Sequence, residues 1–377
     1  MHKNTMGLIF SENPDTSLGE LTSCRSLAAV PVGGRYRLID FALSNMVNSG
    51  ITNVGITTPH RYKSLLDHLG TGKDWDMDRK QDGLFLLSSD ESREDANGVL
   101  GGVDILYNVM SYLKRSKQRY VIVSDCNMIC NLTFGDALRA HEEKDAEVTM
   151  LYTKEPERLL PREVRTKIFF TVGQDEIIED MQVHPSTQKS VNTYMNMFII
   201  GREQLISLVE DCVSHGRHKL TKDLLMGAVN RERAYGYRFD GYKKKINNTQ
   251  TFYEFNLDLL QKEVREELFG RQTDNRIYTK TKDSNPTRYG PESKAVNSFI
   301  ADGCTIEGKV RNSVLFRGVH VGKGTVVENS VIMQDSDIME NCAVTNCIFD
   351  KEVILRSGKR LIGQDTFPLV VGKKTIV

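Results

Sequence analysis

The sequence lacks the features that would point to a membrane or to nucleic acid. Lysine and arginine together number 50, the same as aspartate and glutamate, so no net charge attracts a polyanion. No apolar run reaches the length of about 18 residues that a membrane span needs. The N-terminus, "MHKNTMGLIFSENPD", holds no apolar stretch long enough for a signal peptide. We therefore expect a cytoplasmic protein whose partners include no nucleic acid and no membrane.

Cysteine is present but shows no pairing pattern. The seven cysteines are scattered singly, apart from Cys126 and Cys130, which lack a second pair nearby. An odd count in a large chain predicts reduced thiols, and structural zinc would need a full set of clustered nitrogen or sulfur ligands. We therefore expect buried thiols and no zinc site.

Glycine is missing from the first turn, where an α/β domain often needs it. The segment "MGLIF" (6–10) reads as a buried strand, and such a strand usually leads into a glycine-rich turn that binds phosphate. The turn here is "SENPDTS" (11–17), which carries Glu12 and Asp15 and is followed by glycine only at Gly19. Its backbone cannot easily approach a polyanion, and its carboxylates would repel one.

What is present over residues 1 to about 260 is an alternation of strand-like and helix-like segments. The segment 102–118 has helical spacing of its apolar residues and separates two strand-like runs, an order that predicts a mostly parallel sheet. The strand-like runs are short and rich in Val, Ile, Phe and Tyr, and comprise 53–58, 120–125, 147–153, 167–172 and 194–200.

The C-terminal part has a different period. Residues 269–296 are polar and aperiodic and read as a linker. Beyond them, apolar side chains recur every six residues, a period that is neither helical nor two-fold. A coil of three short parallel strands per turn would produce it, so we expect a left-handed parallel β-helix of hexapeptide repeats over 297–377. An antiparallel sandwich of short strands is the alternative. The repeating positions include Val314, His320, Val326, Ile332, Ile338 and Val344.

The stretch "LTSCRSLAAVPVGGRYRLIDFALSNMVNSGI" (21–51) resembles the N-terminal segment of the bacterial ADP-glucose pyrophosphorylases, also called glucose-1-phosphate adenylyltransferases. Their pattern F-G-G-[KR]-[YF]-R-[IL]-I-D-F-x-L-S-N-x-x-N-S-G-I is almost completely matched from Gly33 to Ile51. The likeness continues through "GGVDILYN", the strand that ends at Asp125, the segment "GYKKKINNTQTFYEFNLDLL" and the repeats. It implies a Rossmann-like α/β nucleotidyltransferase domain (1–268), a linker (269–296) and a left-handed β-helix (297–377).

The resemblance also implies a chemistry. The family joins ATP to glucose 1-phosphate, which gives ADP-glucose for glycogen synthesis and releases pyrophosphate. In-line attack on the α-phosphorus needs positioning and charge neutralisation. In the family, two aspartates hold Mg²⁺, a glycine-rich loop with an arginine binds the triphosphate, and lysines neutralise phosphate oxygens.

Several of these parts are replaced here. The family's G-G-x-G-x-R-L becomes "ENPDTSL" (12–18), with Ser17 at the position of the arginine. The first metal aspartate is retained as Asp125, but Lys245 aligns with the second, and a protonated lysine cannot ligate Mg²⁺. His184 aligns with the lysine that pairs with the sugar phosphate. The resemblance thus implies no intact catalytic site and no metal bound by this chain.

Other positions match the family or suggest an effector site. Arg25 could contact an effector or brace the fold, and the run from Lys243 to Lys244 could bind effector phosphate or form a solvated turn. Asp125 itself could be catalytic, an inherited remnant or a helix cap. The remaining remnants of nucleotide or sugar-phosphate sites are Gly101, Asp104, Lys222 and Asp223.

The pattern of losses is most similar to the D-type subunits found beside a catalytic C-type subunit in some bacteria. It implies a regulatory pseudoenzyme, inactive or nearly so by itself, that joins the C-type chain in a heterotetramer. No cofactor is expected in this chain, Mg²⁺ is expected in the partner, and sugar phosphates or nucleotides are candidate ligands. The alternatives are an active nucleotidyltransferase with a rearranged site, a sugar-nucleotide sensing module, and an acyltransferase using His320, for which packing is the competing interpretation.

Overall fold

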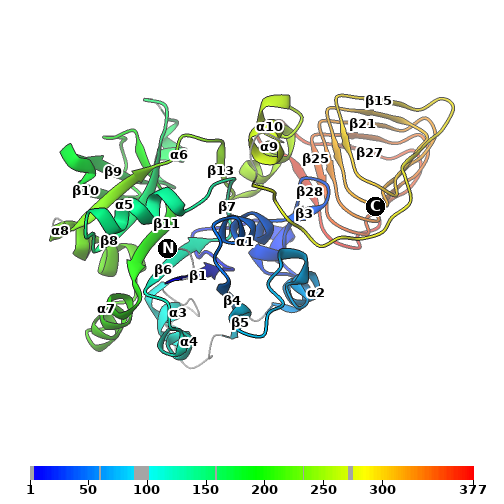
Figure 1. Ribbon diagram of the computed structural model, residues 1–377. Helices are drawn as coiled ribbons and strands as arrows, with labels where there is room; N and C mark the ends of the chain where they lie inside the picture. Colours follow the sequence, from blue (N-terminus) through cyan, green and yellow to red (C-terminus); the bar gives the residue numbers. More distant parts are fainter. Residues whose placement is uncertain (1–3, 59–60, 89–101, 158, 232, 271–274) are drawn as a thin grey trace. The chain divides into compact units, whose positions relative to one another are not determined.

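The computed structural model describes residues 4–58, 61–88, 102–157, 159–231, 233–270 and 275–377. Contacts between residues divide the chain into two compact units (Figure 1). The first unit comprises residues 1–15, 42–60 and 70–241, and the second comprises residues 16–41, 61–69 and 242–377. The segment 16–41, which carries much of the matched N-terminal motif, therefore belongs with the C-terminal part of the chain.

The first unit is built on a mixed sheet whose central strands are parallel. The strand β1 (Thr5–Phe10) is buried along its whole length and pairs in parallel with β4 (Asn53–Thr58) and β6 (Tyr120–Asp125). The strand β5 (Gly83–Ser88) continues the parallel set beside β4. Continuous apolar runs suit these strands because both faces of a parallel sheet are covered. The mostly parallel sheet predicted from the sequence is confirmed.

Antiparallel pairing extends the sheet beyond β6. The strand β11 (Asn192–Gly201) runs antiparallel to β6 and also pairs with β8 (Val148–Lys154) and β9 (Ile168–Val172). Two further strands complete the sheet, β10 (Ile178–Val183) antiparallel to β9 and β12 (Ala234–Arg238) parallel to β8. A short strand, β7 (Met128–Cys130), follows β6.

The helical segment predicted at 102–118 forms two helices, α3 (Gly102–Asn108) and α4 (Met110–Arg115). The break lies at Val109, whose φ of −97° and ψ of 13° leave the α-helical region. Val103, Leu106 and Leu113 nevertheless all reach the apolar core, as the helical spacing predicts. Further helical segments of this unit are η4 (Lys73–Trp75), α5 (Gly135–Glu143), α6 (Pro161–Val164), η6 (Gln174–Glu176), α7 (Arg202–Ser214), the π-helical turn η7 (Leu220–Leu225) and α8 (Met226–Asn230).

The C-terminal part of the second unit is a left-handed β-helix, as predicted, with its coils stacked side by side in Figure 1. The first coil begins at Arg288, inside the segment predicted as a linker. The first sheet consists of β14 (Arg288–Tyr289), β17 (Thr305–Ile306), β20 (His320–Val321), β23 (Asp337–Ile338) and β26 (Ile354–Leu355). The second consists of β15 (Lys294–Val296), β18 (Lys309–Arg311), β21 (Val326–Glu328), β24 (Ala343–Thr345) and β27 (Arg360–Ile362). The third consists of β16 (Phe299–Ile300), β19 (Val314–Leu315), β22 (Val331–Ile332), β25 (Cys347–Phe349) and β28 (Leu369–Val371).

Stacked side chains produce a period close to six residues, because equivalent residues of successive coils, such as Val310 and Val327, lie mostly 17 positions apart. Each side of the coil stacks equivalent apolar residues, such as Val321 on Ile338, in a core that excludes solvent. The corners need left-handed backbone, which Asn329 and Asn346 adopt with φ of 45° and 53°. His320 lies outside this core, with its Nδ1 2.7 Å from Asp337 Oδ1 and its Nε2 3.5 Å from Glu307 Oε2.

The rest of the second unit packs around a tight turn. Gly33 and Gly34 have φ of 56° and 78°, and a Cβ on Gly34 would lie 3.0 Å from Phe299. The Gly33 N–H donates to Asn256 Oδ1 (3.0 Å). The elements around this turn are η2 (Gly19–Thr22), η3 (Leu27–Ala29), β2 (Pro31–Val32), β3 (Tyr36–Arg37), α2 (Lys63–Leu69), β13 (Lys243–Lys245), α9 (Thr249–Asp258) and α10 (Lys262–Phe269), and α1 (Leu38–Asn48) runs from the second unit into the first.

All seven cysteines fall within the described residues and are free thiols, and all but Cys24 are buried. In the described part of the chain, no helix combines the length and apolarity needed to span a bilayer.

Candidate functional site

The loop after β1 is held by its own side chains rather than by glycine. The Ser11 N–H donates to Thr57 Oγ1 (3.2 Å), and the Asp15 N–H donates to Asn13 Oδ1 (2.9 Å). The second bond is an Asx turn, in which a side-chain oxygen replaces a backbone carbonyl. Asn13 is consequently buried, while Glu12 and Asp15 remain on the side of the loop that faces a cavity.

Asp125 ends β6 and lies beside this loop. Its carboxylate is buried, and Oδ2 accepts hydrogen bonds from Asn13 Nδ2 (2.6 Å) and Asn196 Nδ2 (2.7 Å). Asn196 lies in β11 where the pairing with β8 shifts register between Tyr194 and Phe198, and its φ is 55°. A bulge of this kind redirects a side chain, here toward Asp125.

These residues line a cavity of about 470 Å³ in the first unit, which we call the Asp125 pocket. Its far side carries Asp104 from the first turn of α3, whose two carboxylate oxygens lie 2.9 and 3.1 Å from His218 Nδ1. His184, at the end of β10, places Nε2 3.9 Å from Asp15 Oδ2. The lining also includes Lys219 and Lys222.

The charge of the Asp125 pocket does not suit a magnesium triphosphate. Carboxylates of Glu12, Asp15 and Asp125 gather at the loop end, where anionic phosphates would be repelled. Mg²⁺ binds through oxygen ligands, yet Asp125 Oδ2 already accepts two amide hydrogens. Across the described residues, no three His, Cys, Asp or Glu side chains converge as a metal site would require. The donors of the Asp125 pocket therefore do not fit the Mg²⁺ that active members of the family hold.

The structure brings some of the predicted site residues together and leaves others apart. Asp104, Asp125, His184 and Lys222 all line the Asp125 pocket. Asp223 instead accepts a hydrogen bond from the Lys219 N–H (2.7 Å), which fixes the start of η7. Gly101 lies outside the described residues. The predicted residues that belong to the second unit are Ser17, Arg25, Lys243, Lys244 and Lys245.

The second-unit residues have structural partners. Ser17 N donates to Asn247 O (3.0 Å) in a short parallel bridge. Arg25 is buried and its Nη1 lies 2.8 Å from Asp350 Oδ1. This ion pair joins two segments of the second unit. Lys244 pairs with Glu254 (2.9 Å) and Asp258 (3.4 Å), and Lys243 and Lys245 are half-buried in β13.

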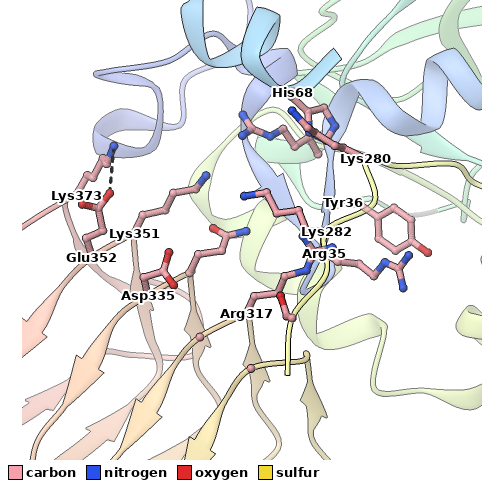
Figure 2. Close-up of a pocket in the computed structure, with 15 residues that line it drawn as sticks. Arg35, Tyr36, His68, Lys280, Lys282, Arg317, Asp335, Lys351, Glu352 and Lys373 are labelled. Carbon is pink, nitrogen blue, oxygen red and sulfur yellow. Dashed lines mark ion pairs between the residues drawn. The ribbon is translucent and has the colours of Figure 1, made fainter. Parts of the chain in front are cut away.

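A second cavity, of about 340 Å³, lies within the second unit and is strongly cationic (Figure 2). We call it the basic pocket. Lys282 and Lys351 extend toward each other across it in Figure 2. Two carboxylates, Asp335 and Glu352, also line it, and Glu352 is paired with Lys373 (3.5 Å). The cationic side chains of the basic pocket are Arg35, Arg37, Lys280, Lys282, Arg317, Lys351 and Lys373.

The cations of the basic pocket are held in place and crowd one another. Arg37 Nη1 donates to Ala29 O (3.0 Å) and to Ser64 Oγ (2.7 Å), and burial lowers the pKa of Arg37 to about 10. Burial, followed by repulsion from Arg37 and Arg25, lowers the pKa of Lys351 to about 7. An excess of positive charge that is partly withdrawn from water attracts an anion, which would relieve this repulsion.

Sequence reasoning missed the basic pocket. Its cations come from the "GGRYR" turn, from the segment predicted as a linker and from corners of the β-helix, so they are distant in sequence. The available signal was local: "YTKTKDSNPTR" (278–288) is basic and directly precedes the first coil.

Comparison with known proteins gives consistent matches. The family described as "Nucleotidyl transferase" matches residues 15–163, and "GlmU-like, C-terminal hexapeptide" matches residues 283–367. The chain is 35% identical to "Glycogen biosynthesis protein GlgD" of Bacillus subtilis (strain 168), with 99% of this chain and 97% of the relative covered. It is 34% identical to the protein of the same name from Geobacillus stearothermophilus, with 87% and 84% covered. A "Glucose-1-phosphate adenylyltransferase" of Acetivibrio thermocellus is 31% identical, with 100% and 91% covered.

Proposed function

Because the chain belongs to the family of the GlgD glycogen biosynthesis proteins and the glucose-1-phosphate adenylyltransferases, we propose that it is a regulatory, largely non-catalytic subunit of such an enzyme in glycogen biosynthesis. Its partner would be a catalytic C-type chain that carries Mg²⁺ and makes ADP-glucose, in a heterotetramer. The chain itself would bind no cofactor.

The observation that carries this proposal is the state of Asp125. In a nucleotidyltransferase this carboxylate would face a metal and a triphosphate, but here it is bonded to two asparagine amides beside Glu12 and Asp15. Loss of one donor that stabilises charge typically reduces turnover by about 10²–10³. Several such losses together support a chain with negligible turnover of its own.

The basic pocket supports the regulatory part of the proposal. Seven cationic side chains against two carboxylates favour a small ligand with one or more phosphate groups. A sugar phosphate or a nucleotide that binds there would shift the partner's activity if its affinity differs between the active and inactive states of the assembly.

The direct test is pyrophosphate release from ATP and glucose 1-phosphate by this chain, by the C-type partner and by their mixture, with and without a panel of sugar phosphates. We expect no release by this chain alone, and a raised rate or an altered effector response in the mixture. In the mixture, Lys282→Met in the basic pocket should weaken the effector response several-fold, because it removes a charge facing the ligand.

The matched control is Lys309→Met, which removes an exposed lysine from β18 that does not line the basic pocket. Turnover by this chain alone at a rate comparable to its partner would refute the proposal and favour an active enzyme with a rearranged site. A mixture indistinguishable from the partner alone would refute it as well.

One observation favours a second candidate, the sugar-nucleotide sensing module. The Asp125 pocket remains a cavity of about 470 Å³ with a buried Asp104 beside His218. Tight binding of ADP-glucose by the isolated chain, measured by calorimetry, would support this candidate over an effector held in the basic pocket.

A further inference from the structure

We propose that Asn13 and Asn196 determine what the Asp125 pocket can bind: their amides occupy Asp125 Oδ2, so the pocket disfavours a metal ion and selects metal-free ligands. This inference rests on the proposed function, because it explains how a nucleotidyltransferase scaffold excludes the magnesium complex of ATP. It concerns Asn13, which takes the place of a glycine in the family's G-G-x-G-x-R-L loop, and Asn196, which lies outside the motifs named above.

The first step is the geometry at one oxygen. Asn13 Nδ2 and Asn196 Nδ2 lie 2.6 and 2.7 Å from the same atom, Asp125 Oδ2. A carboxylate oxygen has two lone pairs, so two amide donors saturate it. Hydrogen bonds to an ionised carboxylate are stronger than those between neutral groups, and the buried position of Asp125 strengthens them further.

The second step is the orientation of the two amides. Asn13 Oδ1 is committed to the Asp15 N–H (2.9 Å), so its Nδ2 is the atom that faces the carboxylate. Asn196 is directed by the bulge in β11 and by a φ of 55°, a left-handed conformation that favours glycine and that asparagine tolerates. Both donors are therefore positioned by the backbone before any ligand arrives.

The third step is the consequence for a cation. Mg²⁺ requires oxygen ligands at about 2.0–2.1 Å and gives up its water reluctantly. An amide nitrogen that donates two hydrogens cannot ligate it, so an ion that approached Asp125 Oδ2 would have to displace both asparagines. The positive ends of the amide dipoles partly offset the carboxylate charge, which weakens the attraction that would drive this exchange.

The ligand class that remains is one without a metal. Glu12 and Asp15 oppose phosphates, whereas Lys219 and Lys222 bring positive charge to the same pocket. A hydroxyl-rich ligand of low charge can donate to the carboxylates and accept from the lysines. A magnesium-nucleotide complex loses its anchor at Asp125.

The test uses the full chain and Mn²⁺ as the probe, with free Mn²⁺ counted by electron paramagnetic resonance. Wild type should take up no Mn²⁺ at this site. Asn196→Asp is isosteric and brings a second carboxylate next to Asp125, so it should raise Mn²⁺ affinity roughly tenfold or more. Combining it with Asn13→Asp should raise the affinity further, and adding Asp125→Asn should abolish the gain.

A matched control distinguishes Mn²⁺ binding at Asp125 from a general effect of one added negative charge. Asn341→Asp introduces the same charge at an exposed corner of the β-helix, also at a left-handed position, and should leave Mn²⁺ binding unchanged. If the aspartate variants fail to fold by circular dichroism, Asn196→Gly serves instead. Glycine keeps the left-handed backbone and opens one lone pair of Asp125 Oδ2, so it should also raise Mn²⁺ affinity.

Two results would overturn the inference. One is a Mn²⁺ ion bound by wild type and lost in Asp125→Asn. The other is a folded Asn196→Asp or Asn196→Gly variant with no gain over wild type. Neither result decides the regulatory proposal, which is read from pyrophosphate release in the mixture, and failure of the mixing experiment would leave the Mn²⁺ titration unaffected.

Discussion

At the scale of single residues, Lys351 shows how a neutral chain can contain a site with a strong local charge. It is half-buried in the basic pocket, next to Asp350, which is already paired with Arg25. Burial, then Arg37 and Arg25, lowers its pKa from an ordinary 10.5 to about 7. The folded chain therefore holds this proton less tightly than the unfolded chain does.

This pKa predicts how stability depends on pH. Between about pH 7 and about pH 10 the unfolded state binds a proton at Lys351 that the folded state does not, so the free energy of unfolding should rise with pH. Below about pH 7 both states are protonated and the full cost of the buried charge is present. Lys351→Met should remove this contribution, which is at most about 1.4 kcal/mol per pH unit.

Urea unfolding gives the free energy of unfolding of wild type and of Lys351→Met at each pH in this range. The difference between the two free energies isolates the contribution of Lys351 from that of the other titrating groups. Lys374→Met, a change at an exposed lysine that pairs with Glu352 (3.5 Å), should run parallel to wild type. Parallel curves for wild type and Lys351→Met would contradict the prediction.

At the scale of elements, α9 links the N-terminal turn to the β-helix within the second unit. Asn256 on α9 accepts from the Gly33 N–H (3.0 Å), and the Tyr253 hydroxyl donates to Asn329 O (2.5 Å). The helix begins with a capping box, in which Asn248 Oδ1 accepts from the Thr251 N–H (2.8 Å) and Thr251 Oγ1 accepts from the Asn248 N–H (3.2 Å). The position of α9 thus depends on its first turn.

The capping box predicts that Asn248→Ala lowers the free energy of unfolding by about 1 kcal/mol, because the Thr251 N–H loses its side-chain acceptor. The neighbouring helix α10 offers the control, since its N-terminal residue Gln261 makes no side-chain capping bond. Gln261→Ala should change stability little. Equal effects of the two substitutions in urea unfolding would show that the box does not stabilise α9.

At the scale of the whole molecule, the chain does not divide where its sequence period changes. Residues 16–41 share a unit with residues 242–377. The contacts that join them include the buried Arg25–Asp350 pair (2.8 Å) and the stacked rings of Tyr36 and Phe269, whose centroids lie 5.0 Å apart. Residues 16–41 of the N-terminal motif therefore pack within the second unit, which contains the β-helix.

A chain shortened after residue 268, the limit of the predicted nucleotidyltransferase domain, should be much less stable than the full chain. It would keep Arg25 but lose Asp350, and removing one partner of a buried ion pair alone costs about 3–5 kcal/mol. Thermal melting and gel filtration should show a lower transition temperature and aggregation. A shortened chain that melts cooperatively at the temperature of the full chain would favour the division drawn from the sequence.

The sequence predicted the elements that depend on local interactions and missed features that depend on contacts between distant residues. Strand-like runs such as 53–58 and 120–125 became β4 and β6 with the same bounds, because burial of continuous apolar side chains is a local signal. The predicted helix at 102–118 was interrupted at Val109, which the apolar spacing alone could not reveal. The start of the β-helix was placed too late, since the first coil at Arg288 has polar, exposed strands.

Contacts between residues distant in the sequence also limited the prediction of the candidate sites. Alignment with the family pattern identified Asp125, and the structure places it with Asp104, His184 and Lys222 in one pocket. Asn196 escaped notice because an asparagine in an apolar strand carries no sign that a bulge turns it toward Asp125. Arg25 was left open between an effector contact and a brace of the fold, because its partner Asp350 lies 325 positions away in the sequence.

The sequence by itself determined the class of each part: a mostly parallel α/β sheet, a coil with a six-residue period, and a phosphate loop whose glycines had become acids and asparagine. These follow from local composition and periodicity, which act between near neighbours along the chain. Only the tertiary structure decided that Asn13 and Asn196 meet on one oxygen of Asp125, and that cations from distant segments surround one cavity. Such sites depend on strand register and coil stacking, and those are set by packing across the whole fold.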